Sequence, residues 1–459
     1  MLVANRGIDD PRVCMEAAAL QACGRYDVTV LGWDREIDRD IVQCQGGVEF
    51  HRLALRSTHA RGATQAAFLA GYYLRAWPRL RALRPVVIHC HDLDTLALGD
   101  RAAVCVHSRL VFDAHENYPD MMQDHLPPVM VSLLRRAEGY LVPRADLLIT
   151  VGGRLAEFYQ ELGARRVTIV GNWKDSDSYR QEPSHREQLR RELGLNGQVA
   201  IAYIAALGRD RHLEPLLAAV AADTRFACVV GGTGCLQGVA SQYASRYSNI
   251  RYLGHVPPPQ VAPLTAACDV VYYGMDCGNP NSRWSAPNKL YEAIAAGKPI
   301  LAGDFGEVGP TVRNHGCGVL AATESAAGIA QGLERLADRD ALSQMAARAA
   351  ALQSQYSARA ARLAVVDAYA GLCKGNVIPA LPGVPVHYRR ISHHHPDASV
   401  HQSDASLRQN AASPPQSPGN ALPGMHASNY AVTIATTAAN TAPVPPTMSP
   451  GATASREAA

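Results

Sequence analysis

The sequence predicts an α/β protein made of two doubly wound parallel-sheet domains that face each other across a cleft, followed by a disordered tail. Short apolar segments alternate with helical segments through both halves of the chain, a pattern typical of parallel sheets covered by helices. At 459 residues the chain is too long for one typical domain and suits two. From Lys374 onward bulky apolar residues are few, which predicts a segment without a core.

The composition narrows the class of protein. Hydrophobic residues make up 47% of the chain and charged residues 19%, and the net charge of +3 is too small to indicate a nucleic-acid partner. The eleven cysteines are scattered and include no C-x-x-C, which argues against a disulfide framework or a zinc site. No apolar run approaches the roughly 18 residues of a spanning helix, and no signal peptide is visible. We expect a cytoplasmic protein, with peripheral contact at the inner face of the membrane as an additional hypothesis.

The first domain is predicted over residues 1–173 and opens with a βαβ unit. We expect a strand at Met1–Ala4, a helix at Val13–Gly24 and a second strand at Val28–Gly32. The loop between the first strand and the helix holds one glycine, Gly7. A Rossmann dinucleotide fingerprint needs three glycines, so we predict no dinucleotide site there.

A basic and aromatic segment follows, with a helical period over Ala63–Leu83. Between His51 and His91 there is no acidic residue, but there are seven arginines, which are Arg52, Arg56, Arg61, Arg75, Arg79, Arg81 and Arg84. Such a helix suits an anionic membrane surface or a lipid-diphosphate acceptor. The simpler alternative is a solvated face beside a packed one, and the sequence leaves both open.

Polar clusters end the next two predicted strands. The first strand runs into His89, His91 and Asp92, and the second into Asp113, His115, Glu116 and Tyr118. Open α/β sheets bind ligands at the carboxyl ends of their strands. Three histidines with carboxylates are also a possible zinc site. We expect the histidines of the first strand to diverge, however, and so predict no metal.

The second domain is predicted over residues 174–355 and opens with a polar hinge at Lys174–Arg186. A strand at Val199–Ile204 leads into a turn and helix whose first turn carries Arg209 and Arg211. The forked guanidinium of arginine suits a diphosphate. The alternative is an exposed loop arginine.

The stretch from Ser282 to Asp304 has the clearest helix boundaries. Ser285 suits an N-cap and Pro287 a first-turn position, while Gly297 and Pro299 end the helix. A buried strand is expected at 300–302.

Lys289 and Glu292 are three residues apart and share one face of this predicted helix, near its N-terminus. The free N–H groups and partial positive charge of that end suit a diphosphate. A lysine there can neutralise phosphate, and a carboxylate one turn on can accept hydrogen bonds from ribose hydroxyls. The alternative is an ordinary surface Lys/Glu pair.

The run PNKLYEAIAAGKPIL resembles the donor-nucleotide signature of family 4 glycosyltransferases, which are retaining enzymes of the GT-B fold. The segments IHCHD and DAHE are similar to further patterns of that family, and the resemblance covers about residues 3–372. It implies transfer of a sugar from a UDP- or GDP-sugar to an acceptor hydroxyl with retention, without metal or cofactor. The acceptor would be a saccharide or a lipid-linked molecule, in polysaccharide or glycolipid biosynthesis.

The resemblance also implies roles for particular residues. His115 matches the catalytic histidine that reaches the sugar, and Glu292 matches the glutamate that holds the ribose. Two positions depart from the family pattern, because Trp284 replaces the first acid of a Glu-x7-Glu motif and Ala205 replaces an arginine. The implied donor-binding residues are Arg209, Arg211, Asn288, Lys289, Leu290 and Glu292.

The remaining segments and the alternative functions complete the prediction. Residues 356–373 are expected to form a terminal helix that returns toward the first domain, and residues 374–459 a disordered low-complexity tail. The alternatives to a transferase are a GT-B epimerase or phosphorylase, a non-catalytic nucleotide-sugar-binding subunit, and a scaffold on a membrane surface.

Overall fold

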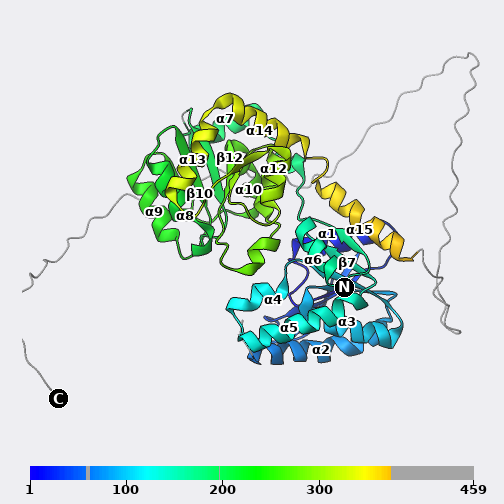
Figure 1. Cartoon of the computed structure of the whole chain (residues 1–459). Coiled ribbons are helices and arrows are strands. Elements are labelled where there is room, and N and C mark those ends of the chain that lie inside the picture. The colour runs from blue at the N-terminus through cyan, green and yellow to red at the C-terminus, as the bar shows by residue number, and fades with distance from the viewer. Residues whose placement is uncertain (58–62, 196, 374–459) are drawn as a thin grey trace, which may run out of the picture. The chain divides into compact units, whose positions relative to one another are not determined.

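The computed structural model describes residues 1–57, 63–195 and 197–373, and contains two sheets flanked by helices (Figure 1). The predicted disordered tail, residues 374–459, lies outside the described residues. The predicted fold class of two doubly wound α/β domains is confirmed. The strands of the first sheet are β1 Leu2–Val3, β2 Thr29–Asp34, β3 Ile41–Gln45, β4 Val48–Ala54, β5 Val87–His91, β6 Arg109–Ala114, β7 Leu147–Thr150 and β8 Val167–Ile169.

The first sheet has the strand order β3-β4-β2-β1-β5-β6-β7-β8. All neighbours are parallel except β3 and β4, which form an antiparallel hairpin at one edge. The turn of this hairpin is Gly46–Gly47, and both residues have positive φ. The sequence analysis did not predict these two strands. The helices of this domain are α1 Pro11–Ala22, α2 Ala63–Leu83, α3 Leu93–Val106, α4 Tyr118–Met121, α5 Pro128–Leu141 and α6 Gly153–Glu161.

The second sheet is parallel throughout, with the strand order β11-β10-β9-β12-β13-β14. Its central strand β9 is buried along its whole length, as expected when helices cover both faces. The strands are β9 Val199–Ile204, β10 Phe226–Gly231, β11 Ile250–Tyr252, β12 Val270–Tyr273, β13 Ile300–Ala302 and β14 Gly318–Leu320. The helices are α7 Pro183–Glu192, α8 Leu213–Ala221, α9 Gln237–Arg246, α10 Pro258–Ala267, α11 Asn288–Ala296, α12 Val308–His315, α13 Ala326–Ala337 and α14 Arg339–Ala351.

The last described helix, α15 (Ala358–Cys373), packs against α1 of the first sheet, and the two lie side by side in Figure 1. Val365 and Tyr369 of α15 share a buried cluster with Val13 and Leu20 of α1. The chain therefore passes between the two sheets twice. The two passing segments touch through a bridge between Lys174 and Ser357.

Two predicted boundaries match the structure, the first helix lies two residues earlier than predicted, and the predicted cap of α11 does not form. The helix α2 has the predicted bounds, and Gly297 ends α11 with a φ of 61°, a conformation that glycine adopts without strain. The prediction that Ser285 caps α11 was wrong. Pro287 occupies the N-cap position and no side chain caps the helix. Ser285 instead follows the short 3-10 helix η5 (Pro280–Trp284).

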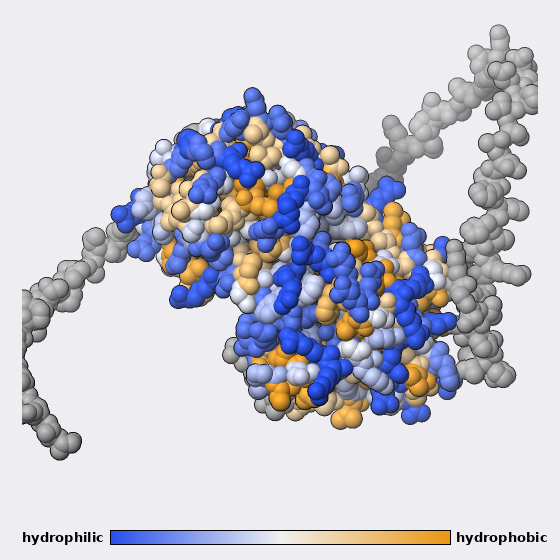
Figure 2. Space-filling model, viewed as in Figure 1, coloured by the Kyte–Doolittle hydropathy of each residue, from blue (hydrophilic) through white to orange (hydrophobic). Residues whose placement is uncertain are grey.

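The arginines of α2 are less free than the sequence indicated. Arg75 and Arg79 both form ion pairs with Asp40, at 2.8 and 2.7 Å, from the loop before β3. Exposed apolar side chains lie nearby in the fold, and Figure 2 shows small apolar areas scattered among polar ones on the face in view. Among the described residues, no helix combines the length and the apolar character needed to cross a bilayer.

Candidate functional site

The carboxyl ends of β5 and β6 meet around one buried carboxylate, Asp113, as the parallel pairing of these strands requires. The Arg12 guanidinium donates to both of its oxygens, through Nε at 2.8 Å and Nη2 at 2.6 Å. The Oδ2 atom also lies 3.0 Å from Nδ1 of His91 and 2.8 Å from Nε2 of His115. Asp113 thus fixes two histidines and an arginine at the sheet edge.

The charges of this cluster set the protonation of His115. Burial alone would raise the pKa of Asp113, but the charges of Arg12 and His115 and their hydrogen bonds outweigh it and hold that pKa well below its usual range. Burial alone would lower the pKa of His115, but the carboxylates of Asp92 and Asp113 raise it to about 9. At neutral pH His115 is therefore an imidazolium cation.

One ring nitrogen of His115 remains available to a ligand. Nε2 is committed to Asp113, whereas Nδ1 has only a long contact of 3.4 Å with Asp92. About 21% of the His115 side chain is exposed. The neighbouring Asp92 has φ 61° and ψ 164°, a conformation that costs energy in a residue with a Cβ and is concentrated at functional sites. The site can therefore offer a fixed cationic N–H donor.

The prediction that His89 and His91 diverge was wrong. Residues two apart on a strand lie on the same face, and the two imidazole rings stack with centroids 4.5 Å apart. Together with Glu16 and Asp113 they offer four buried ligand atoms within 4.8 Å of one another. The Arg12 guanidinium lies in the same cluster, however, 3.2 Å from Glu16, and already pairs with the Asp113 carboxylate. The absence of a metal stays a prediction.

The inner part of this cluster reaches α15. Nδ1 of His89 lies 2.8 Å from the Tyr369 hydroxyl, and its Nε2 lies 3.5 Å from Glu16. Burial raises the pKa of Glu16 to about 8 and lowers that of His89 well below its usual range. Both side chains are therefore neutral at pH 7, which removes the cost of burying their charges. The returning helix is in this way tied to the sheet edge that carries His115.

Arg211 lies at the carboxyl end of β9, in the short 3-10 helix η4 (Arg209–Arg211). Its guanidinium donates to the Tyr273 hydroxyl and lies 5.5 Å from the centre of that ring. The second predicted arginine, Arg209, is exposed, and no hydrogen bond or ion pair of its side chain occurs within the described residues. Arg211 is thus the one of the two that the fold holds in place.

Glu116 connects the two domains next to these residues. Its Oε2 accepts a hydrogen bond of 2.8 Å from Nδ2 of Asn281, on η5. Burial raises its pKa, while the Asn281 hydrogen bond and the charges of His115 and Arg211 oppose the shift. The carboxylate therefore lies within electrostatic reach of both predicted site residues, one from each domain.

Trp284, which replaces the first acid of the family motif, makes a contact between the domains. Its indole Nε1 donates to Oδ2 of Asp120 at 3.0 Å, and its ring packs on Phe158 with centroids 5.0 Å apart. Asp120 also accepts from Arg135 at 2.9 Å. The position that holds a sugar-binding acid in the family pattern is occupied here by an aromatic anchor.

The predicted residues of α11 form a second group. Nζ of Lys289 lies 2.5 Å from Oε2 of Glu292, and both side chains are about nine-tenths buried. Asn288, the first residue of the helix, accepts a hydrogen bond of 2.8 Å from Lys174. Two lysine ammonium groups therefore lie at the N-terminus of α11, where the helix dipole is also positive.

Leu290 does not belong to this group. Its side chain is 1% exposed and packs in the core, and its backbone N–H donates to the carbonyl of Pro287 at 3.1 Å. Backbone amides of the loop after β13 are also engaged within the fold. The amides of Glu307 and Gly309 already donate to carbonyls of Ser285 and Phe305. The donor role of Leu290, like that of the other predicted donor-binding residues, stays a prediction.

The glycines after β10 serve close packing of the backbone. Gly232 has φ 136°, and a Cβ on it would lie 1.9 Å from the carbonyl oxygen of Ala205. Its N–H donates to the carbonyl of Gly254 at 2.7 Å. Only glycine fits at this position, so the glycine-rich loop is explained by the fold without a ligand.

Two cavities lie at the carboxyl ends of the strands. One of about 620 Å³ follows β12, β13 and β14 and is lined in part by Asp276, Asp304 and Glu324. Three carboxylates would repel a diphosphate but can accept hydrogen bonds from sugar hydroxyls. The other, about 390 Å³, lies between the β1–α1 loop and the end of β2, with Arg6 and Trp33 in its wall.

Two protein families match the chain. Residues 10–173 match the family described as "Glycosyl transferase 4-like domain", and residues 198–339 match "Glycosyl transferases group 1". Together they span more than half of the chain, one on each sheet. The chain is a glycosyltransferase of the GT-B type. This confirms the coarse part of the predicted function, and the EC 2.4 class with it.

The relatives of this glycosyltransferase differ in what they make. The glycogen synthase of Mycobacterium tuberculosis is 23% identical over 344 residues, which are 72% of this chain and 78% of the relative. The sucrose-phosphate synthase of Thermosynechococcus elongatus is similar in structure, with a TM-score of 0.63 and 14% identity over 82% of this chain and 98% of that one. Anabaena Alr3699/HepE, solved in complex with UDP, has a TM-score of 0.59 and 16% identity over 81% of this chain and 99% of that one. At these identities the structures establish the fold.

Some site residues were missed by sequence reasoning. Arg12 lies 101 residues from Asp113 in the chain, and Asn281 lies 165 from Glu116, so no local pattern pairs them. Tyr273 ends a buried strand, where an aromatic residue is ordinarily read as core. The signal available was that Tyr273 ends its strand and that Arg12 and Asn281 belong to the first helical segment after a strand, on the side where such sheets bind ligands.

Proposed function

We propose that the chain transfers a sugar from a UDP- or GDP-sugar to an acceptor hydroxyl with retention of the anomeric configuration, without metal or cofactor. The observation that carries the proposal is the N-terminus of α11, where Lys289 pairs with the buried carboxylate of Glu292 and Lys174 donates to Asn288. Cations and a positive helix end suit the diphosphate, and the carboxylate suits the ribose. Anabaena Alr3699/HepE binds UDP and UDP-glucose in crystals, which supports a nucleotide-sugar donor.

In the reaction the bond between the anomeric carbon and the diphosphate oxygen breaks, and the acceptor oxygen bonds to that carbon. Negative charge grows on the leaving diphosphate, and Arg211 with Lys289 would stabilise it electrostatically. His115 is already an imidazolium, so it cannot take the proton of the acceptor hydroxyl. We assign that proton to the departing diphosphate, on the face from which the leaving group departs, which gives retention.

His115 and Glu116 would hold the sugar. Nδ1 of His115 can donate to a ring or hydroxyl oxygen, and the Glu116 carboxylate can accept from a sugar hydroxyl. Glu116 thereby offers an acid near the site although Trp284 has replaced the usual one. The acceptor would enter from the N-terminal domain, beside the cavity of about 390 Å³ at the β1–α1 loop.

The hypothesis of membrane contact concerns the kind of acceptor that the protein uses. A lipid-linked acceptor would be met at α2, where Leu74 is 78% exposed among the arginines. Replacing Arg75, Arg79 and Arg81 together should reduce sedimentation with anionic vesicles if that face contacts lipid. Unchanged sedimentation would leave a soluble saccharide as the acceptor class.

The experiment that tests the proposed function is a transfer assay with UDP- and GDP-sugars and a panel of saccharide and lipid-linked acceptors. Proton NMR of the product reads the anomeric configuration. A product of retained configuration would support the proposal if it still forms in metal-free buffer and is no longer formed by Glu292→Ala. An inverted product, or turnover that depends on added metal, would contradict it.

A second candidate function is a non-catalytic nucleotide-sugar-binding subunit. Trp284 favours it, because the acid of the family motif has become an anchor between the domains. This candidate predicts tight nucleotide binding with no transfer to any acceptor and no hydrolysis of the donor. Turnover with any donor would exclude it.

A further inference from the structure

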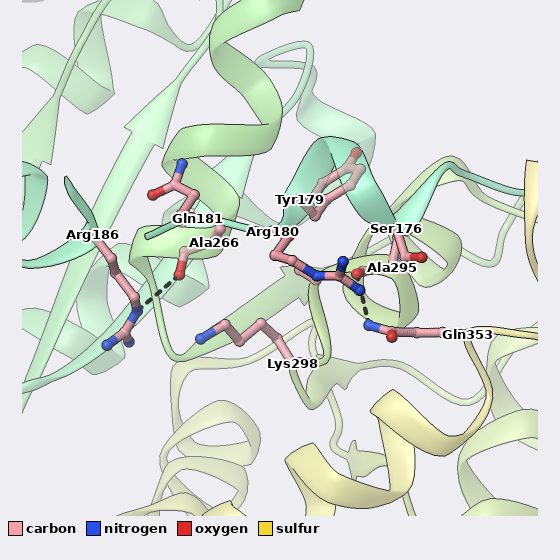
Figure 3. A pocket seen from close by; sticks show the side chains of 10 residues that line it. Ser176, Tyr179, Arg180, Gln181, Arg186, Ala266, Ala295, Lys298 and Gln353 are labelled. Atoms are coloured by element: carbon pink, nitrogen blue, oxygen red, sulfur yellow. Dashed lines mark hydrogen bonds between the residues drawn. The ribbon is translucent and has the colours of Figure 1, made fainter. Parts of the chain in front are cut away.

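A cavity of about 240 Å³ lies beside the two segments that connect the domains (Figure 3). It is below the ~300–1,000 Å³ of pockets for drug-sized ligands, so its ligand would be small. The wall contains three basic side chains and no acidic one. Its residues are Ser176, Tyr179, Arg180, Gln181, Arg186, Ala266, Ala295, Ala296, Lys298 and Gln353.

Lys298 is the unusual member of this wall. Within the described residues its ammonium group has no hydrogen bond and no ion pair, in contrast to Lys174 and Lys289. Burial lowers the pKa of Lys298 to about 8, and the nearby Arg186 guanidinium adds to this, while the Asp269 carboxylate opposes it. A half-buried, unpaired ammonium is a costly group, which an anion would stabilise.

The other charges around Lys298 do not neutralise it. Asp269 accepts hydrogen bonds from Arg186 at 2.9 Å and Arg190 at 3.1 Å, and from a backbone N–H at 2.9 Å. Burial raises the pKa of the Cys268 thiol to about 12, so it carries no charge at neutral pH. Arg180 is exposed and paired only with the equally exposed Asp177. The cavity therefore has a net positive charge.

The side chains lie so that an anion can reach several of them. In Figure 3 the ammonium end of Lys298 points toward the side of the cavity that Arg186 lines, and Arg180 points toward Gln353. A phosphate group in the cavity would lie among these cations and offset their charge.

We propose that this cavity is a binding site for a small phosphate-bearing anion, separate from the donor site. Ser176, Tyr179, Arg180 and Gln181 belong to the first connecting segment, and Gln353 to the second. A bound anion would link both segments to Lys298, after the C-terminal end of α11. The site is thus placed to stiffen the connection between the domains, whichever reaction they catalyse.

The test is calorimetric titration of the full chain with inorganic phosphate and with glucose 6-phosphate, at constant ionic strength. We expect saturable binding that weakens at least about tenfold in Lys298→Met, the loss expected for one charge-assisted hydrogen bond. Lys298→Arg should retain binding, which excludes loss of folding as the cause. The matched control is Arg191→Gln, which removes one exposed charge from α7 outside the cavity and should bind as the wild type does.

Two further experiments locate the site and identify the source of the phosphate. Lys289→Ala should leave phosphate binding unchanged, because Lys289 lies in the donor site and not in this cavity. Bound sulfate, whose charge is constant near pH 8, should slow amide hydrogen exchange at 176–181 and 352–356, and its affinity should fall as the pH rises through about 8. If glucose 6-phosphate binds more tightly than phosphate, the ligand is a phosphorylated metabolite. If the two bind equally, the ligand is inorganic phosphate. No saturable binding of either at millimolar concentration, or equal weakening in Arg191→Gln, would overturn the proposal.

Discussion

The indole N–H of Trp284 donates a hydrogen bond to the Asp120 carboxylate at 3.0 Å, across 164 residues of sequence. Trp284 ends η5 in the C-terminal domain, and Asp120 lies in α4 of the N-terminal domain. The residue that replaces a family acid thus holds the loops of the two domains together. The replacement of the motif acid by Trp284 thus creates a structural contact between the domains.

We expect Trp284→Phe to lower the free energy of unfolding by about 0.5–1.5 kcal/mol, the net value of one hydrogen bond. The ring would still pack on Phe158, and Asp120 would keep its bond to Arg135. Urea denaturation measures the change. In an Asp120→Asn background the same substitution should cost less, and fully additive costs would show that the two side chains are not coupled.

We expect Trp284→Glu not to restore the family motif. The new carboxylate would face Asp120, and two like charges in a partly buried position destabilise each other. The variant should therefore be less stable than Trp284→Phe and should not bind the donor more tightly. Denaturation and calorimetry with UDP or GDP check both parts, and a rise in donor affinity would contradict this interpretation.

We expect Asp113→Asn to destabilise the fold by about 3–5 kcal/mol, because it leaves the Arg12 charge buried without its partner. The control is Asp223→Asn, which breaks an ion pair with Arg225 at the surface and should cost about 1 kcal/mol or less. Urea denaturation measures both variants. Equal costs would mean that the buried cluster contributes no more to stability than a surface pair does.

His115 predicts a dependence of stability on pH. Its pKa rises from an ordinary 6.5 to about 9 on folding, so its contribution is fully present below about pH 6.5 and is lost as the pH rises through about 9. The difference in unfolding free energy between wild type and His115→Gln should therefore be larger at pH 6 than at pH 10. His125→Gln, which makes the same substitution at an exposed histidine, is the matched control.

The donor site predicts the outcome of nucleotide titrations. Glu292→Ala and Lys289→Ala should each weaken binding of the preferred diphosphate, among UDP, GDP and ADP, by about 1–3 kcal/mol. Glu187→Ala, an exposed glutamate of α7, should bind as the wild type does. Binding of none of the three nucleotides by the folded protein would remove the donor site from α11.

The sequence by itself determined the two α/β domains, the bounds of α2 and the end of α11 at Gly297. These features depend on hydrophobic period, on breaker residues and on the backbone freedom of glycine, all of which act within a few residues. The three-residue spacing also placed Lys289 and Glu292 on one helix face, where they form an ion pair. Local pattern was sufficient for each of these predictions.

Only the tertiary structure decided which distant side chains meet. Asp40 pairs with Arg75 and Arg79 from 35 and 39 residues away. The β3–β4 hairpin was not recognised because the edge strand β3 is exposed along most of its length and lacks a buried apolar run. The local pattern marked Ser285 as the cap of α11, but Pro287 occupies that position in the structure. Such pairings depend on strand order and on burial, which no short window of sequence contains.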